Sequence, residues 1–281
     1  MCRQLGYVGP PVGVGELILR GPHSLYAQSW APLDMRAGGT INADGFGVAW
    51  WRRADVGTEG ARDAVTTRYR NHAPIWTDPA VAEVLGQLES RSVVAAVRSA
   101  TVGMPVERSA CAPFTDEHWA FSHNGVIPDW RATLVAVLAD LNEVFATAKL
   151  FDSPAVLLQA EALTDSAALW VLLRGLLAAI DPVGPVTSPA DALRLLVTAV
   201  LRHQPSARLN LLLGNGLELW ATTCWHALSV LVTDDYTVLS SEPYDADPRW
   251  QSVADRQLVI ATPGHYTITA LELPATERVC S

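Results

Sequence analysis

The order in which apolar segments follow one another constrains the fold of this chain more than any other feature of its sequence. Strand-like segments come first, long helical segments occupy the middle, and strand-like segments return towards the end. Grouped strands and grouped helices favour α+β layers, whereas alternating strand-helix-strand units form parallel sheets. The expected strands are residues 3–9, 45–51, 61–70, 92–100, 118–126, 207–223 (as a hairpin), 226–232, 236–241, 257–261 and 265–271, and the expected helices are residues 15–20, 79–88, 129–145, 152–180 and 188–203.

Three of these segments carry specific signals. Residues 92–100, SVVAAVRSA, have small and β-branched residues on both faces, which is typical of a strand buried on both sides. Residues 118–126, HWAFSHNGV, predict a strand that ends in a turn at Asn124-Gly125. Residues 207–223 contain two apolar runs around Gly214-Asn215-Gly216, which predicts a hairpin. No internal repeat or low-complexity segment divides the chain, and we expect a single domain over residues 1–281.

Composition and charge exclude several classes of function. The chain has 281 residues, 49% of them hydrophobic, and a formal net charge of -9, so a substantial core and an acidic surface are expected. Because Lys and Arg form no cluster, we expect no nucleic-acid binding. The chain has a single lysine, Lys149, which nearly excludes a lysine Schiff base or a phosphate-loop lysine.

The cysteines and the apolar runs indicate a reducing, cytoplasmic location. The four cysteines, Cys2, Cys111, Cys224 and Cys280, form no C-x-x-C pair, so no zinc site, redox motif or disulfide framework is expected. The beginning of the chain lacks the pattern of a signal peptide. The most apolar run, residues 168–180, contains Arg174 and is too short to span a bilayer.

Cys2 is the first candidate for catalysis. Removal of the initiator Met is expected before a small residue, which would place a thiol and a free α-amine on Cys2. An α-amine has a reference pKa of about 7.7–8.0 and accepts a thiol proton near neutrality, so one residue supplies nucleophile and base. No spacing among the seven histidines marks another base. The alternative is an ordinary cysteine in a frayed terminus.

Two further segments supply groups that acyl transfer requires. The Asn124 amide and the Gly125 N–H are able to point at one oxygen, as an oxyanion requires, or they form a common Asn-Gly turn. Arg98 lies within an otherwise apolar predicted strand, and a buried Arg needs a partner. That partner is either a structural carboxylate or the carboxylate of a substrate, held by the guanidinium fork.

Two aspartates stand in segments with an equally simple structural interpretation. Asp44 lies between Asn42 and Gly45, where glycine lets a loop approach a ligand or simply turns the chain into a strand. Asp152 precedes Ser153-Pro154, a good helix start, so its side chain either caps a helix or binds a ligand.

Taken in order, these segments resemble the class II glutamine amidotransferase family. The motifs are M-C-R at 1–3, N-x-D-G-x-G at 42–47, R-S-A-T at 98–101, S-H-N-G at 122–125 and Asp152-Ser153 at a helix start. The resemblance implies an α+β fold of the N-terminal-nucleophile type, a four-layer αββα sandwich. It implies Cys2 as the nucleophile with its own α-amine as base, and an oxyanion hole of Asn124 and the Gly125 N–H.

The same resemblance implies a set of substrate contacts. Arg98 would hold the α-carboxylate of a glutamyl group, and Asp152 would hold its α-ammonium group. The other residues implied in substrate binding are Thr101, Asn42, Asp44 and His123.

The second half of the chain narrows the resemblance. Residues 207–216, 219–223 and 241–250 resemble the stand-alone amidohydrolases of bacterial ergothioneine biosynthesis. Those enzymes remove the γ-glutamyl group of γ-glutamyl-hercynylcysteine sulfoxide. The resemblance implies a small-molecule γ-glutamyl substrate, no cofactor, no metal, no nucleic acid and no membrane.

Two other functions remain open at this point. A glutaminase subunit would deliver ammonia to a separate synthetase, because no synthetase half fits in this chain. A binding module without activity is the third possibility, and the intact Cys2, Arg98, Asn124 and Gly125 argue against it.

The two enzymatic functions differ in the group that leaves. A trimethylammonium group is attracted by aromatic faces and carboxylates. Candidate aromatic residues near the motifs are Trp30, Trp50, Trp51 and Trp119, unless they simply pack in the core. Residues 244–247, Tyr-Asp-Ala-Asp, have suitable chemistry for a cation or form a solvated turn.

Overall fold

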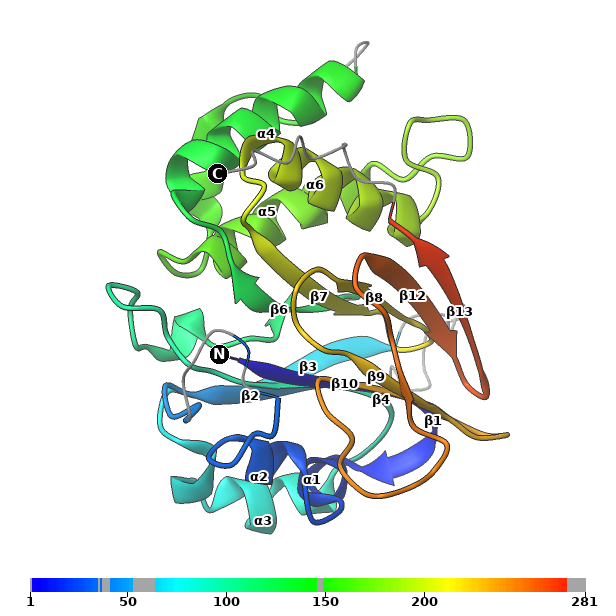
Figure 1. The fold of residues 1–281 in the computed structure, drawn as a ribbon. Coiled ribbons are helices and arrows are strands. Elements are labelled where there is room, and N and C mark those ends of the chain that lie inside the picture. The colour runs from blue at the N-terminus through cyan, green and yellow to red at the C-terminus, as the bar shows by residue number, and fades with distance from the viewer. Residues whose placement is uncertain (1, 35, 37–40, 53–63, 146–148, 272–281) are drawn as a thin grey trace, which may run out of the picture.

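The computed structural model describes residues 2–34, 36, 41–52, 64–145 and 149–271. Four layers are stacked in it: a small helical layer, two β-sheets, and a second helical layer (Figure 1). Neighbouring strands within both sheets run antiparallel. The α+β expectation is therefore confirmed, and the architecture is the four-layer αββα sandwich of the N-terminal-nucleophile type.

The first sheet has the beginning of the chain at its centre. Its strands, in spatial order, are β11 (Gln251–Ser252), β9 (Ser229–Val232), β10 (Thr237–Ser240), β1 (Arg3–Gly13), β4 (Glu89–Val97), β2 (Phe46–Arg52) and β3 (Val65–Asn71). The helical layer on its outer face contains α1 (Val14–Leu19), α2 (Leu25–Gln28) and α3 (Ala80–Glu83), with 3₁₀ turns at Ile75–Thr77 and Leu85–Gln87.

The second sheet is built around the S-H-N-G motif. Its strands, in spatial order, are β13 (His265–Ala270), β12 (Gln257–Thr262), β8 (Leu219–Thr223), β7 (Arg208–Gly214), β6 (Ala120–Val126) and β5 (Phe114–Thr115). The helices that cover it are α4 (Trp130–Val144), α5 (Asp165–Ala178) and α6 (Pro189–His203), and 3₁₀ turns lie at Arg108–Ala110 and Pro154–Gln159.

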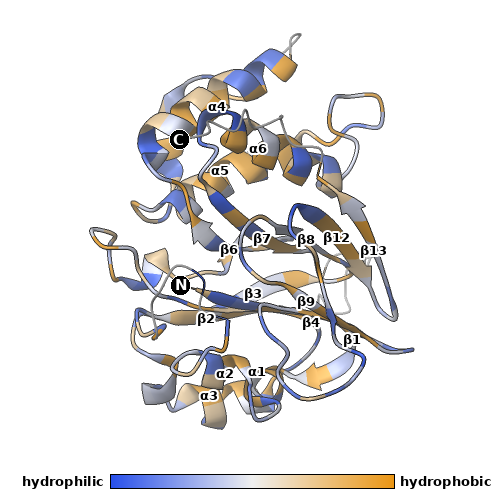
Figure 2. Ribbon diagram, in the orientation of Figure 1, coloured by the Kyte–Doolittle hydropathy of each residue, from blue (hydrophilic) through white to orange (hydrophobic). Residues whose placement is uncertain are grey.

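Strand β1 is buried on both faces because it lies between a helical layer and a sheet. Leu5 and Tyr7 pack with Leu17 of α1, whereas Val8 packs with Leu212 of the second sheet. Side chains alternate between the two faces of a strand, so each face meets a different core. Figure 2 shows the resulting hydrophobic colouring along the strands of both sheets.

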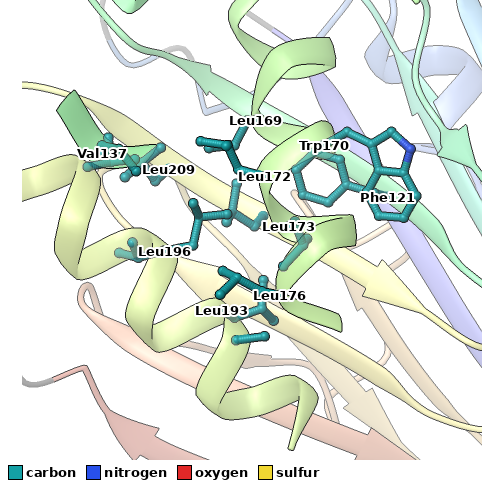
Figure 3. Close-up of a cluster of buried hydrophobic side chains, with 14 of the residues drawn as sticks. Phe121, Val137, Leu169, Trp170, Leu172, Leu173, Leu176, Leu193, Leu196 and Leu209 are labelled. Atoms are coloured by element: carbon teal, nitrogen blue, oxygen red, sulfur yellow. The ribbon is translucent and has the colours of Figure 1, made fainter. Parts of the chain in front are cut away.

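The largest core lies between the second sheet and α4–α6. Figure 3 shows its leucine-rich centre, with Trp170 of α5 stacked on Phe121 of β6 at a centroid distance of 5.6 Å. The helices begin where the sequence provides caps. Thr164 accepts from the N–H of Ala167 at the start of α5, and Ser188 does the same for Asp191 ahead of Pro189 in α6.

Several expectations need correction at their boundaries. The strand predicted over 92–100 ends at Val97, so Arg98 follows β4 instead of lying within it. The region 79–88 is a short helix and a 3₁₀ turn, and only 165–178 of the region 152–180 is α-helix. None of the helices in the described part of the chain is both long enough and apolar enough to cross a membrane.

Candidate active site

Cys2 lies directly before β1, at the end of the first sheet where β4 also ends. The antiparallel register places Arg3 opposite Val97, so the residues after β4 pass beside Cys2. The Cys2 side chain is half-buried, and its Sγ lies 3.7 Å from the carbonyl oxygen of Ser99. The fold therefore brings the M-C-R and R-S-A-T motifs together.

The N-x-D-G-x-G motif joins the same group through its backbone. The Asp44 N–H donates to the Arg98 carbonyl at 2.9 Å, and the Arg98 N–H donates to the Gly45 carbonyl at 2.7 Å. The Asp44 carboxylate accepts from the N–H of Ala100 at 2.7 Å. Gly45 has a φ of +118°, and a Cβ there would lie 2.4 Å from Cys111 Sγ, so glycine is required.

These contacts hold the Arg98 backbone and leave its guanidinium nearly free. The Arg98 side chain is half-buried, and its contact among the described residues is a long one, 3.5 Å from Nη1 to the Asp44 carbonyl. A guanidinium fork with unused donors suits a carboxylate ligand.

Two other thiols in the described chain are buried. Burial raises the pKa of Cys111 to about 11 and that of Cys224 to about 11. Both remain protonated near neutral pH, and a thiol is a poor nucleophile compared with a thiolate. Of the three cysteines described, Cys2 is the one that is not buried.

The structure contradicts one prediction about Asn124, namely that it forms a turn. It lies inside β6, opposite Asn210 of β7, and the strand continues to Val126, so the predicted turn at Asn124-Gly125 is wrong. Its side chain is 1% exposed, and neither amide atom has a hydrogen-bond partner among the described residues. Buried polar groups normally have partners. An unpartnered, buried amide fits a group whose partner is the substrate.

Gly125 is required by the packing of β6 on β7. A Cβ at this position would lie 1.8 Å from the carbonyl oxygen of Arg208 and 2.4 Å from Nε2 of His123. The Arg208 carbonyl also engages His123, whose Nε2 lies 2.8 Å from it and whose Nδ1 lies 3.0 Å from Oγ of Ser166. These bonds account for the buried His123 structurally, and its predicted contact with substrate stays a prediction.

The Asn124 amide lines a small polar cavity that the sequence did not reveal. The cavity has a volume of about 10 Å³, room for about one water molecule. Its lining residues are Arg3, Asp34, Asn124, His226, Ala227 and Ser241. Burial, followed by the charges of Arg208 and Arg3, lowers the pKa of His226 to about 3, so its imidazole is neutral near pH 7.

Asn210 holds His226 in this place. Its Oδ1 accepts from the N–H groups of Cys224 and His226, both at 3.0 Å, and its Nδ2 donates to the His226 carbonyl at 2.9 Å. The segment ARLNLLLGNG contains Asn210, but a lone histidine sixteen residues later gives no sequence signal.

A second polar cluster surrounds Arg3. Its Nε donates to Glu242 at 2.8 Å, its Nη1 donates to the Cys2 carbonyl at 3.1 Å, and Nη2 donates to the Asp34 carbonyl. Glu242 also accepts from the Leu33 N–H at 2.8 Å and lies 2.5 Å from His23 Nε2. Burial would raise the pKa of Glu242, but the bonds from His23 and Leu33 and the charge of Arg3 lower it.

The remaining predicted site residues lie at the periphery. Asn42 is 2% exposed and donates through Nδ2 to the Gln28 carbonyl at 3.1 Å, which ties its loop to α2. Thr101 and Asp152 are exposed. Ser153, not Asp152, caps the 3₁₀ turn that follows. No hydrogen bond or ion pair between described residues joins Asp152 to Cys2 or Arg98, so its predicted role stays a prediction.

The tryptophans near the motifs pack with other side chains. Trp50 and Trp51 are buried in the cores on either face of β2. Trp119 packs on Trp220 at 5.6 Å, and Trp30 packs edge-on against Tyr26 and Trp76.

An open cleft begins beside the small cavity. Its volume is about 820 Å³, enough for a drug-sized ligand. Its lining residues are Pro22, His23, Leu33, Asp34, Arg36, Ala227, Ser229, Ser241, Glu242, Pro243, Asp245, Ala246 and Ser252. The cleft shares Asp34, Ala227 and Ser241 with the cavity that contains Asn124, so the two adjoin.

Comparison of the sequence with known proteins gives near full-length matches. A model of the class-II glutamine amidotransferases matches residues 24–279. The chain is 40% identical over 274 residues to a Mycobacterium tuberculosis protein named gamma-glutamyl-hercynylcysteine sulfoxide hydrolase, with 97% of each chain covered. It is 38% identical over 273 residues to the protein of the same name from Mycolicibacterium smegmatis, with 96% of this chain and 100% of that protein covered.

Comparison of the structure gives more distant neighbours with the same fold. A glutamine aminotransferase class-II domain protein from Silicibacter pomeroyi superposes with a TM-score of 0.56 at 20% identity, over 96% of this chain and 99% of the other. Glutamine phosphoribosylpyrophosphate amidotransferase from B. subtilis superposes with a TM-score of 0.58 at 14% identity, over 97% of this chain and 50% of the other.

Proposed function

The chain belongs to the class-II glutamine amidotransferase family, and from that premise we propose that it is a γ-glutamyl amidohydrolase of ergothioneine biosynthesis. Its substrate is γ-glutamyl-hercynylcysteine S-oxide, and it releases glutamate. The observation that carries this proposal is the 40% identity, over 97% of both chains, to a relative named as the hydrolase of this compound.

The chemistry proceeds through a thioester on Cys2. With Met1 removed, the α-amine of Cys2 takes the thiol proton, and the thiolate attacks the γ-carbonyl carbon. The negative oxygen that forms is stabilised by Asn124 Nδ2 and the Gly125 N–H. The C–N bond then breaks as the amine takes the proton from the α-ammonium group, and water hydrolyses the thioester to give glutamate and the free thiol.

The glutamyl group is held on the side of Cys2 where β4 ends. Arg98 pairs with the α-carboxylate, an assignment supported by its nearly free guanidinium and by its backbone bonds to the Asp44 loop. Thr101 follows on the same segment. We assign the α-ammonium group to Asp152, which is exposed and free to contact a ligand in the structure described.

The open cleft favours a hydrolase with a large leaving group over a glutaminase. Ammonia needs no cleft of about 820 Å³, whereas an amine that carries an imidazole and a betaine group does. The Asn124 cavity adjoins this cleft, and we place the leaving amine in the cleft. The reaction uses protein groups and water alone, acts on a small molecule, and is suited to a reducing cytoplasm.

A comparison of substrates tests the proposal. The release of glutamate is measured from γ-glutamyl-hercynylcysteine S-oxide, from its unmethylated histidine analogue and from glutamine. We expect the highest kcat/KM for the first. Equal turnover of glutamine would favour the glutaminase subunit instead. Equal turnover of the two histidine compounds, with poor turnover of glutamine, would show that size sets the preference.

A further inference from the structure

The acidic side chains that line the open cleft differ in whether a basic side chain pairs with them. Asp34 lies 3.2 Å from Nε of Arg36, and Glu242 is occupied by Arg3 and His23. Asp245 also lines the cleft, and no basic side chain in the described part of the chain forms an ion pair with it. Asp245 therefore supplies the cleft with a carboxylate charge that the protein itself leaves uncompensated.

Asp245 is held firmly although it lacks a cationic partner. Its Oδ1 accepts from Trp250 Nε1 at 2.8 Å and from the N–H of Asp247 at 3.1 Å. The Trp250 ring packs edge-on against buried Tyr244 at 5.0 Å. The hydrogen bonds reach one oxygen, so the other remains available to a ligand in the cleft.

We propose that Asp245 binds the trimethylammonium end of the leaving group, an inference that rests on the proposed function. A quaternary ammonium group donates no hydrogen bonds and is attracted by charge alone, so a fixed carboxylate in a cleft suits it. Pro22, Pro243 and Ala246 supply apolar wall for its methyl groups. No Phe, Tyr or Trp is among the described residues that line the cleft, so the carboxylate takes the place that the face of such a ring has in other sites.

The matched variants are Asp245→Asn and Asp247→Asn. The first keeps the Oδ1 acceptor for Trp250 and removes the charge. The second removes the charge of a neighbouring aspartate that is already paired with Arg249 at 2.6 Å. We expect Asp245→Asn to lower kcat/KM about tenfold for the trimethylated substrate, since about 1.4 kcal/mol corresponds to a factor of ten. The loss should not occur with glutamine, and Asp247→Asn should behave as wild type.

A binding measurement separates this proposal from the proposed function. The released amine, hercynylcysteine S-oxide, is titrated calorimetrically into the wild type and into both variants, with a des-trimethylammonium analogue as the second ligand. The subsite is supported if Asp245→Asn, but not Asp247→Asn, weakens binding of the amine and leaves binding of the des-trimethylammonium analogue unchanged. Unchanged binding, or equal weakening of both ligands, overturns it. A wild type that binds the amine but hydrolyses no γ-glutamyl amide would instead reject the proposed function.

The small cavity carries a second, independent inference. Three buried polar atoms among its lining residues have no hydrogen-bond partner in the described chain: Oδ1 and Nδ2 of Asn124 and Nδ1 of His226. The cavity has room for one water molecule, and a buried water typically makes about three hydrogen bonds. Ser241 and Arg3 also line this cavity.

We infer that His226 is a positioning residue that acts on Asn124 through one bound water. An amide whose Oδ1 accepts from that water is fixed with Nδ2 turned the other way, where it donates to the oxyanion. The His226 ring, whose backbone is held by Asn210, fixes the water in turn. Without this arrangement the Asn124 amide is free to rotate by 180° and present an oxygen to the oxyanion.

A double-mutant cycle tests this inference with any γ-glutamyl amide that the enzyme hydrolyses. His226→Ala should lower kcat about tenfold with little change in KM, and His226→Asn, which places an amide near the Nδ1 position, should restore most of it. In an Asn124→Ala background, His226→Ala should cause no further loss. Additive losses, or a failure of His226→Asn to recover activity while its melting temperature matches that of the wild type, would overturn the inference.

Discussion

Arg3 and Asn124 line the same small cavity, but the polar groups around them differ in how completely their hydrogen bonds are satisfied. Next to Arg3, Glu242 accepts bonds from Arg3, the Leu33 N–H and the Asp34 N–H, and lies against His23. The Asn124 amide, in contrast, makes no bond within the described chain.

The difference separates groups that hold the site from groups that react. Breaking a satisfied buried ion pair leaves an uncompensated charge, which costs stability. A buried amide without protein partners already lowers stability, and its Nδ2 donates to an oxyanion only when one is present. We therefore expect changes on the Glu242 side to affect folding and changes on the Asn124 side to affect turnover.

The largest effect on turnover is expected from Cys2, the proposed nucleophile. Cys2→Ala should abolish turnover, because no other described thiol is accessible, and should leave the melting temperature near that of the wild type. Turnover is measured as glutamate release, and the melting temperature is measured by thermal unfolding. Intact mass should show Met1 absent from active protein, and full activity of a homogeneous Met1-retaining preparation would contradict the assignment of the α-amine as base.

Glu242→Ala should cause the largest loss of stability. The change leaves buried Arg3 without its carboxylate, and breaking a buried pair costs about 3–5 kcal/mol. Urea unfolding measures it. The control is Glu16→Ala, which breaks an exposed pair with Arg20 and should cost less than about 1 kcal/mol. Similar losses in both variants would remove the distinction between the Arg3 cluster and the surface.

Asn124→Ala should produce the opposite pattern. Loss of one oxyanion donor lowers kcat by about 10²–10³, with little change in KM. The free energy of unfolding should change little, since no hydrogen bond within the described chain is lost. Its neighbour Asn210 makes bonds to Cys224 and His226, so Asn210→Ala should destabilise the protein clearly. Unchanged kcat in Asn124→Ala would remove this residue from the oxyanion hole.

Arg98→Ala should act mainly on binding. A hydrogen bond to a charged group contributes about 1.5–3 kcal/mol, so KM should rise roughly ten- to hundredfold for any γ-glutamyl substrate. Arg98→Lys keeps the positive charge but lacks the planar guanidinium fork. Its KM in steady-state kinetics therefore measures how much the fork contributes to binding. A fall in kcat at constant KM would place Arg98 in the transition state instead.

The smallest expected effect is a pH dependence of stability. The pKa of His226 is lowered to about 3 in the folded chain, against an ordinary 6.5. Its contribution to stability is therefore fully present above pH 6.5 and is lost as the pH falls towards 3, because only the unfolded chain takes up the proton. Between pH 6.5 and 5.5 the wild type should lose about 1 kcal/mol more than His226→Gln. Parallel curves from urea unfolding would contradict the buried, neutral state.

The sequence determined most of the fold because local patterns carried the information. The grouping of strands and helices predicted α+β layers, and the helix expected over 188–203 begins after the Ser188 cap. The boundary errors share one cause. The local pattern predicted a strand that continues through Arg98 and a turn at Asn124-Gly125. In the structure, tertiary pairing decides both boundaries: β4 ends before Arg98, and pairing with β7 keeps Asn124 and Gly125 within β6.

The candidate site divides in the same way. Cys2, Arg98, Asp44 and Asn124 stand in short motifs, so their residue types and order were sufficient to single them out. Glu242 and His226 lie 239 and more than 100 residues from Arg3 and Asn124 respectively, and neither stands in a recognisable spacing. Only the antiparallel pairing of β10 with β1 and of β7 with β6 brings them to Cys2. Long-range strand pairing therefore decided which polar groups are satisfied and which are left for the substrate.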